Sequence, residues 1–484
     1  MKLLSKSNIF TLIVILAYAG LTLVSLNHGY FWDNIQQTSK EAHWFYLTDF
    51  SSLLMPQNPN AEIVATGYHP PLMGIMTALL WKIFGYKLWV SHVFVFIWSC
   101  ILIYNLKKVI SRFFNENLAG WVLLIVLFES TLLTQFAIAS SDFILFTAFV
   151  VSLRAILERK SLLLAIGIFF LCTINMRGVF AGALLFVSQV YYNFQQTNKF
   201  TVSQIFRAII PYLPTLLILA AYYGYYFYQN GWFFAHNSTE GHYSIPRNFG
   251  TIIKHAAEFV LRSVENGRIS IWAAGCLVAW LWWKHKTTLP AEVKLLVSIF
   301  AFLTGLYVLF IFITQMPFSA RYFMPQFFIL TMLAMIWLGN FLKENYLKLT
   351  FILIIGFELT GNLWVYPDKI AKSWDCTLAH LPYYELRKEC FEYIDQEKLD
   401  YNKISAGFCL YGNRRFVELG NRDNRVGTTP DREYFIYSNI SNVEDGFFAE
   451  LQNNEIWTPI KEFRKGFVGI TIFKRNQRQY SIDQ

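Results

Sequence analysis

Long apolar runs separated by short polar and basic loops fill the first three quarters of the chain. A helix needs about 20 residues to cross a bilayer, so runs of this length predict membrane-spanning helices. We expect about eleven of them, beginning near Asn8, Leu88, Leu118, Phe143, Leu162, Val179, Ile209, Ile269, Val293, Tyr322 and Leu349. A further run, Pro71–Phe84, is shorter and carries Trp81-Lys82, which is typical of an amphipathic helix lying in the membrane interface.

The pattern changes after Tyr366, where the chain becomes polar and its apolar runs weaken. In this tail Tyr383–Tyr393 has helical spacing, and three stretches rich in β-branched and aromatic residues predict strands. Those stretches are Ile404–Leu410, Tyr434–Tyr437 and Phe467–Phe473. The predicted fold class is an all-α polytopic membrane domain over residues 1–366, with a first outer loop at 27–87, followed by a small α/β domain over 367–484.

Basic residues between the spans predict the side on which each loop lies, because cytoplasmic loops are enriched in Lys and Arg. Lys2 and Lys6 place the N-terminus in the cytoplasm. If Pro71–Phe84 does not cross, the later cytoplasmic loops are all basic; they hold Lys107-Lys108, Arg159-Lys160, Lys199, Lys284-His285-Lys286 and Lys343. The C-terminal domain is then extracytoplasmic, and because we find no C-terminal sorting signal we expect a bacterial inner membrane.

Composition supports a multi-pass membrane protein. The 484 residues are 55% hydrophobic and 18% aromatic, and only 15% are charged, whereas soluble domains carry about 25% charged residues. The net charge of +9 is scattered between the spans, so we expect no nucleic-acid partner. Ile9–Leu26 could also be a signal peptide, but its length favours a span. Three cysteines of the tail, Cys376, Cys390 and Cys409, are compatible with one disulfide and one free thiol.

Three ionisable residues stand just outside apolar runs, where such groups are costly and often functional. Asp33 follows Phe31-Trp32, His69 precedes Pro70-Pro71, and Asp142 opens a later span. Each has a simpler explanation: a solvated loop carboxylate for Asp33, a structural helix-start residue for His69 and an N-cap for Asp142. As a functional set, Asp33 could accept a proton from an acceptor hydroxyl, with Asp142 as a second acid facing it.

Cationic residues lie on the same predicted side as these acids. Arg177 occupies a tight turn between two spans, and Arg321-Tyr322 stands at the mouth of another; each arginine could bind a phosphate or a carboxylate. The long loop after Gly231 holds Glu240 between His236 and His242 and could cover a donor or select an acceptor. The spacing of these three side chains is not diagnostic of a metal site. Lys82 of the short interfacial helix is a further candidate for substrate binding.

Read together, these motifs resemble the superfamily of polyprenyl-phosphate-dependent protein mannosyltransferases and aminoarabinose transferases, which has the GT-C fold. The resemblance is carried by Asp33, by Tyr68-His69-Pro70-Pro71-Leu72, by Ser141-Asp142, by Arg177-Gly178 and by Ala320-Arg321-Tyr322. It covers roughly the first 182 residues, and beyond them only the Arg-Tyr motif.

The resemblance implies inverting transfer of a sugar from a polyprenyl-phosphate donor to a glycan, lipid or protein acceptor on the extracytoplasmic face. It implies that Asp33 and Asp142 are the catalytic acids and that His69, Arg177 and Arg321 contact the phosphate. Relatives often carry Asp-Glu where this chain has Asp33-Asn34, so a divalent cation near Asp33 and Asp142 stays an open expectation. We recognise no motif in the tail beyond Tyr366.

A non-enzymatic polytopic protein is the alternative, either a lipid-sugar transporter or flippase, or a degenerate GT-C assembly factor. A transporter should place its ionisable residues near the bilayer centre. The candidates here cluster at one face, which favours chemistry at the membrane surface.

Overall fold

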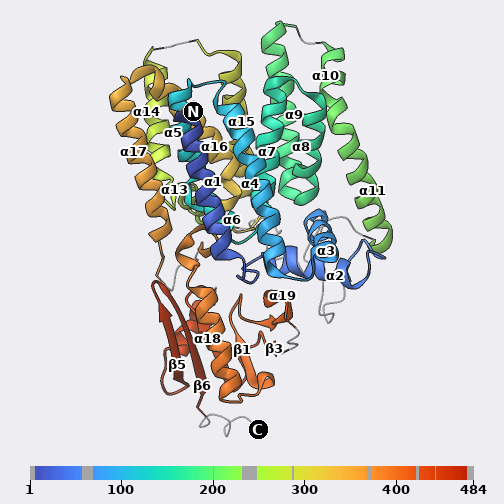
Figure 1. Ribbon diagram of the computed structural model, residues 1–484, viewed down its shortest axis with the longest axis vertical. Coiled ribbons are helices and arrows are strands. Elements are labelled where there is room, and N and C mark those ends of the chain that lie inside the picture. The colour runs from blue at the N-terminus through green and yellow to red at the C-terminus, as the bar shows by residue number, and fades with distance from the viewer. Residues whose placement is uncertain are drawn as a thin grey trace, which may run out of the picture.

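The computed structural model describes residues 6–56, 69–199, 201–231, 248–285, 288–367, 373–420, 424–441 and 443–476. A helical bundle forms one part of the protein and a small α/β domain the other, and the start of α1 lies at the end of the bundle far from the α/β domain (Figure 1). The prediction of an all-α polytopic membrane protein with a C-terminal α/β domain is confirmed.

Each expected span corresponds to a helix or to a pair of helices. These are α1 (Lys6–Ser25), α4 (Leu88–Ile110), α5 (Glu116–Leu127) with α6 (Ser130–Ala137), α7 (Ser141–Glu158), α8 (Ser161–Ile174), α9 (Met176–Thr197), α10 (Val202–Ile209) with α11 (Leu213–Asn230), α14 (Ile269–His285), α15 (Ala291–Ile313), α16 (Met324–Phe341) and α17 (Glu344–Thr360). Within the described chain, six segments are long and apolar enough to cross a membrane alone, and α5 with α6, bent by 62°, makes a seventh. Helix α7 is buried along almost its whole length, so it need not be apolar toward lipid.

The basic loops gather at the end of the bundle that carries the N-terminus. Lys107 at the end of α4 donates to the Asn8 side chain over 2.7 Å, and Lys294 at the start of α15 donates to Gln195 at the end of α9 over 3.0 Å. These contacts require that Pro71–Phe84 does not reverse the direction of the chain. The opposite end of the bundle faces the α/β domain (Figure 1).

The short apolar run forms α3 (Leu72–Phe84), which packs beside α2 (Glu41–Leu47) where the bundle meets the C-terminal domain (Figure 1). Thirteen helical residues reach about 20 Å, which is too short for a hydrocarbon core of about 30 Å. Helix α3 buries Trp81 and exposes Ile83 and Phe84, as expected of a helix lying in the interface. Upstream of α2 the chain forms a π-helical turn, Ile35–Lys40.

The C-terminal domain has a four-stranded mixed sheet in the order β1-β4-β6-β5, covered by α18 (Tyr383–Gln396). The strands are β1 (Ile404–Ala406), β4 (Tyr434–Ser438), β5 (Trp457–Lys465) and β6 (Val468–Arg475); β2 (Gly412–Asn413) and β3 (Arg425–Val426) form a separate ribbon. Strand β1 is shorter than predicted because residues 407–411 leave the sheet as a turn. Strand β5 was not predicted, because this edge strand is mostly exposed and contains Pro459, so it lacks alternating apolar residues.

The first loop of the bundle is part of the core of the C-terminal domain. The Phe31 ring stacks on His380 with a centroid distance of 4.7 Å, and His28 stacks on Tyr384 at 4.0 Å. Trp32 contacts Phe408 of the 407–411 turn edge to face at 4.9 Å. The residues just before Asp33 are therefore packed against the C-terminal domain. This packing fixes the position of the Asp33 carboxylate.

Candidate functional site

A cavity of about 420 Å³ opens between α7, α9, α15 and the start of α16. Its walls are apolar over most of their length and include Leu145, Phe180, Leu303, Leu306, Phe310 and Ile313. Its polar residues are Gln37, His69, Asp142, Arg177, Thr314 and Arg321. Such a mixed cavity, largely apolar with a few polar groups, is typical of a site for an amphipathic ligand.

Asp142 and Arg177 meet at this cavity because two helices begin there. The N-cap of α7 is Ser140, whose hydroxyl accepts from the Asp142 amide over 3.1 Å, so the Asp142 carboxylate is left to make other contacts. Its Oδ1 accepts from Nη2 of Arg177 over 2.6 Å. Asn175 caps α9 by accepting from the Arg177 amide over 3.0 Å. Glycine is required at Gly178 in the first turn of α9, because a Cβ there would lie only 1.6 Å from the Leu171 carbonyl oxygen of α8.

Arg321 is the centre of the site. It lies in the turn before α16, is buried, and makes ion pairs with three carboxylates. Nη2 donates to Asp33, Nε lies 3.4 Å from Asp142 Oδ2, and Nη1 lies 3.0 Å from Asp375 Oδ2. The Tyr322 ring lies against both guanidinium groups, with its centroid 4.0 Å from Arg177 and 5.3 Å from Arg321. These cation–π contacts and the ion pairs restrict both cations to the mouth of the cavity.

Asp33 lies on the other side of Arg321. Its side chain is 33% exposed, whereas that of Asp142 is 4% exposed, and Asp33 is not among the residues that line the cavity. Asn34 donates to the Ile138 carbonyl over 3.0 Å, which holds the loop against the α6–α7 turn. Trp32 has a left-handed backbone (φ 55°), a conformation that non-glycine residues adopt infrequently. One carboxylate therefore faces the cavity and another lies near solvent, with one guanidinium between them.

His69 lines the cavity beside Arg177. Burial, and to a smaller extent the Arg177 charge, lowers the pKa of His69 to about 4. The ring is therefore neutral at physiological pH. Its Nδ1 accepts from the Met176 amide over 3.3 Å, so the single proton of the neutral ring is placed on Nε2. His69 can donate a hydrogen bond to an anion in the cavity but adds no positive charge.

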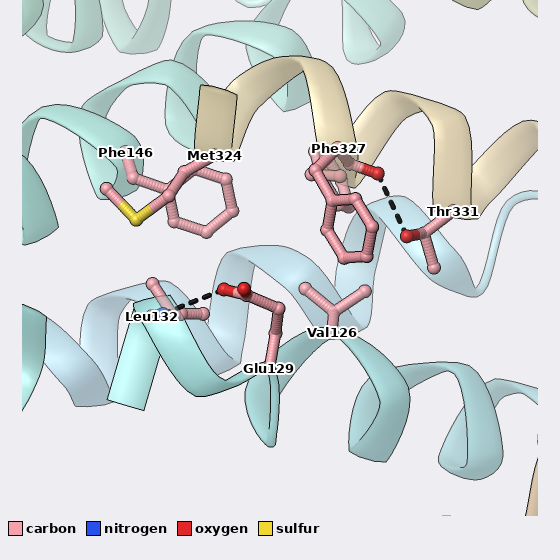
Figure 2. Close-up of a pocket in the computed structure, with 8 residues that line it drawn as sticks. Val126, Glu129, Leu132, Phe146, Met324, Phe327 and Thr331 are labelled. Carbon is pink, nitrogen blue, oxygen red and sulfur yellow. Dashed lines mark hydrogen bonds between the residues drawn. The ribbon is translucent and has the colours of Figure 1, made fainter. Parts of the chain in front are cut away.

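A second layer of buried charge supports the Arg321 turn from within the bundle. Arg268 donates through Nε to Glu129 over 2.9 Å and through Nη1 to the Ala320 carbonyl over 2.6 Å, which fixes the residue before Arg321. Glu129 caps α6 by accepting from the Thr131 and Leu132 amides. Figure 2 shows Glu129 beside a small apolar pocket between α5–α6 and α16, with about 10 Å³ of free space. That space is about the size of one water, so this pocket is part of the packing.

Asp375 was not predicted from the sequence. It belongs to the short turn Trp374–Cys376, which follows the last membrane helix, and is 2% exposed. Burial raises the pKa of Asp375, and the nearby Arg321 charge offsets part of this effect. No periodicity or motif singles out this carboxylate, because its partner lies 54 positions earlier in the chain and the two meet only in the folded protein.

The structure brings together six of the eight predicted site residues: Asp33, His69, Asp142, Arg177, Arg321 and Tyr322. Lys82 lies elsewhere, where it pairs with the exposed Asp49 and covers the Tyr46 ring at 4.4 Å. Glu240 lies outside the described residues. All six cysteines are unpaired, so the disulfide that the spacing allowed does not form.

The predicted divalent cation remains a prediction. Among the described residues, no group of three His, Cys, Asp or Glu side chains is arranged to hold a metal ion. Arg321 lies where a cation bridging Asp33 and Asp142 would be, and its guanidinium already supplies the positive charge between them.

Comparisons with known proteins support the fold. No family model and no curated protein matches the sequence. Among solved structures, the chain is similar to ArnT from Cupriavidus metallidurans in the apo state, with a TM-score of 0.56 and 12% identity over 95% of this chain and 97% of that chain. The structure of the same protein bound to undecaprenyl phosphate gives a TM-score of 0.50 and 10% identity over the same shares. The chain therefore has the GT-C fold that the sequence motifs predicted.

Proposed function

We propose that this chain, which has the fold of ArnT, is an inverting glycosyltransferase that uses a polyprenyl-phosphate sugar. The cavity beside Arg321 carries the proposal, because its two parts match the two parts of such a donor. The apolar wall between α9 and α15 would receive the isoprenoid chain. Arg177, Arg321 and His69 at the mouth would bind the phosphate through charge and hydrogen bonds. The ArnT structure bound to undecaprenyl phosphate supports this assignment by analogy.

The reaction follows from the positions of the two acids. Asp33 takes the proton of an acceptor hydroxyl, whose oxygen attacks the anomeric carbon from the face opposite the phosphate. The new carbon–oxygen bond forms as the bond to the phosphate oxygen breaks, and the electron pair leaves with the phosphate. A phosphate leaving group needs no proton if positive charge compensates it, which Arg177 and Arg321 provide. Asp142 holds both guanidinium groups in place.

Asp33 must be released before it can act as a base, since in this structure its carboxylate is bound to Arg321. The donor phosphate competes for the same guanidinium. We therefore expect donor binding to weaken the Asp33–Arg321 pair and to activate the base only when a donor is present.

The proposal includes the side of the membrane on which the reaction takes place. The site lies at the end of the bundle opposite the basic loops, and the positive-inside rule supports an extracytoplasmic position for it and for the C-terminal domain. The membrane we propose is a bacterial inner membrane. The acceptor is a glycan, lipid or protein hydroxyl that reaches Asp33 from that face.

The test is transfer by purified protein in lipid nanodiscs, with a panel of radiolabelled polyprenyl-phosphate sugars. Asp33→Asn should abolish transfer while the protein stays folded and inserted. Asp49→Asn is the matched control, because Asp49 is an exposed aspartate of the same loop and its ion pair within the described part of the chain is with Lys82, away from Arg321. Full activity in Asp33→Asn would disprove the role of this base. Addition of EDTA to the same assay tests the cation, and we expect little change because Arg321 supplies the charge.

A further inference from the structure

Asp375 belongs to the segment after the last membrane helix and contacts Arg321 from outside the donor cavity. Its Oδ2 lies 3.0 Å from Arg321 Nη1, and it is not among the residues that line the donor cavity. It therefore contacts the cation of the site without reaching the space for the substrate. Its ion pair with Arg321 is the contact through which we expect Asp375 to affect the reaction.

The backbone around Asp375 is fixed by side chains of the membrane bundle. Gln135 of α6 donates to the Asp375 carbonyl over 2.6 Å, and Ser130 at the start of α6 donates to the Cys376 carbonyl over 3.2 Å. Arg262 donates to the Ser373 hydroxyl over 2.5 Å. Three polar side chains from two different helices are thus used to hold one short turn, and the result is a fixed position for the Asp375 carboxylate.

This arrangement carries a cost that packing alone does not explain. Three carboxylates, Asp33, Asp142 and Asp375, share two guanidinium groups. Desolvation of an ionised carboxylate costs several kcal/mol, and an apolar residue in its place would usually be no less stable. A long arginine side chain, on the other hand, loses about 2 kcal/mol of rotamer entropy when it is ordered. A fixed Asp375 carboxylate next to Nη1 orders the Arg321 side chain before the substrate binds, so this rotamer entropy is not lost during binding.

We infer that Asp375 is a positioning residue, which holds the Arg321 guanidinium between the donor cavity and Asp33. The C-terminal segment is then part of the active site. The inference rests on the proposed function, in which Arg321 binds the phosphate of the donor. It also explains how Arg321 can release Asp33 when a donor binds, since Nη1 stays anchored to Asp375 while Nη2 changes partner.

Three substitutions separate position from charge. Asp375→Asn keeps an oxygen beside Nη1 but removes the charge; because we infer that position matters more than charge, it should stay within about threefold of the wild-type kcat and lipid-phosphate affinity. Asp375→Glu keeps the charge but displaces the carboxylate by one methylene, and Asp375→Ala removes the partner. Both should lower kcat about tenfold or more, which is the usual cost of a misplaced catalytic group. The readouts are kcat and KM for the donor, and direct binding of a polyprenyl monophosphate in nanodiscs.

The outcomes are distinct. A wild-type-like Asp375→Ala, or a folded Asp375→Asn as impaired as Asp375→Ala, would overturn the positioning role. If Asp375→Ala does not fold, Asp375→Glu and Asp375→Asn still give the decisive comparison. Wild-type protein that binds polyprenyl monophosphate but transfers no sugar would contradict the transferase, and the binding series would still test how Arg321 is positioned. Wild-type protein that shows neither binding nor transfer would overturn both.

Discussion

Helix α7 carries buried charge at both of its ends, and the two ends are built differently. At its start, Asp142 pairs with Arg177 of α9 and with Arg321 before α16, so three separate segments meet there. At its end, Arg154 pairs with Glu158 one turn later over 2.8 Å and donates to Asn105 of α4 over 3.0 Å. The first set joins distant segments, has an excess of carboxylates and opens on a cavity, whereas the second is local, because Glu158 also pairs with the neighbouring Lys160 over 2.6 Å.

The comparison shows how to distinguish a functional ion pair from a structural one within one helix. An i,i+4 pair forms within one helix and needs no other segment of the fold to bring its charges together. Charges that come from distant segments, are incompletely balanced and face a cavity have been brought together at a free-energy cost. That cost is explained if the carboxylates hold the guanidinium groups of Arg177 and Arg321 in place for an anion in the cavity, such as a lipid phosphate that displaces Asp33 from Arg321.

Asp142→Asn should have the largest effect, because it removes the common partner of Arg177 and Arg321. We expect a loss of transfer of about 100-fold or more, the size seen when a preorganised electrostatic group is removed. The control is Ser140→Ala, which removes the N-cap of the same helix and should cost about 1 kcal/mol of stability without an effect on activity. Equal losses of activity in both variants would mean that this end of α7 serves helix capping only.

Leu306→Trp tests the apolar part of the site. Leu306 lies on the α15 wall of the cavity, so a larger side chain should narrow the space for an isoprenoid chain. We expect KM to rise about tenfold for a long-chain donor and to change little for a donor with a short chain. Steady-state kinetics with the two donors would measure this. An equal change for both donors would place the lipid chain elsewhere.

His69 should have a smaller effect, with a defined pH dependence. His69→Ala should lower transfer about tenfold and His69→Gln less, because glutamine retains an N–H donor. The pKa of His69 is lowered to about 4 from an ordinary value near 6.5. Below pH 6.5 the unfolded chain therefore binds a proton that the folded protein does not bind until pH 4.

Stability due to the neutral His69 ring is consequently complete above pH 6.5 and lost as the pH falls toward 4. Thermal unfolding of wild type and His69→Gln at pH 7.5 and pH 5 would show this. The wild type should lose more of its melting temperature between the two values. Identical losses in the two proteins would mean that His69 is not buried as a neutral ring.

Arg154→Met tests the other end of α7 and should leave transfer unchanged. Breaking its partly buried ion pair should cost about 1 to 3 kcal/mol of stability, since Glu158 keeps Lys160 as a partner at 2.6 Å. The melting temperature and the activity per folded molecule separate the two effects. A loss of activity here would remove the distinction between the two ends of the helix.

The sequence predicted one side of the site better than the other, for a physical reason. Asp33, Asp142, Arg177 and Arg321 each interrupt an apolar run, and a charge next to a membrane span is visible in the pattern alone. Asp375 lies in a polar tail, where an aspartate is ordinary, and only its contact with Arg321 makes it unusual. The same contrast holds for the fold, because apolar spans predicted the bundle, while the exposed edge strand Trp457–Lys465 gave no alternating pattern.

Substitution of Lys82 should have the smallest effect, and it tests whether a charge outside the Arg321 network contributes to donor binding. It was a candidate because it stands beside Trp81 at the membrane interface, yet it pairs with Asp49, whose side chain is 81% exposed. Exposed pairs contribute little, so Lys82→Met should change neither donor KM nor kcat beyond about twofold. A large rise in KM would show that a positive charge outside the Arg321 network recruits the donor from the membrane surface. Raising the salt concentration would then weaken the wild type toward the variant, because surface attraction is screened whereas the buried contacts of Arg321 are not.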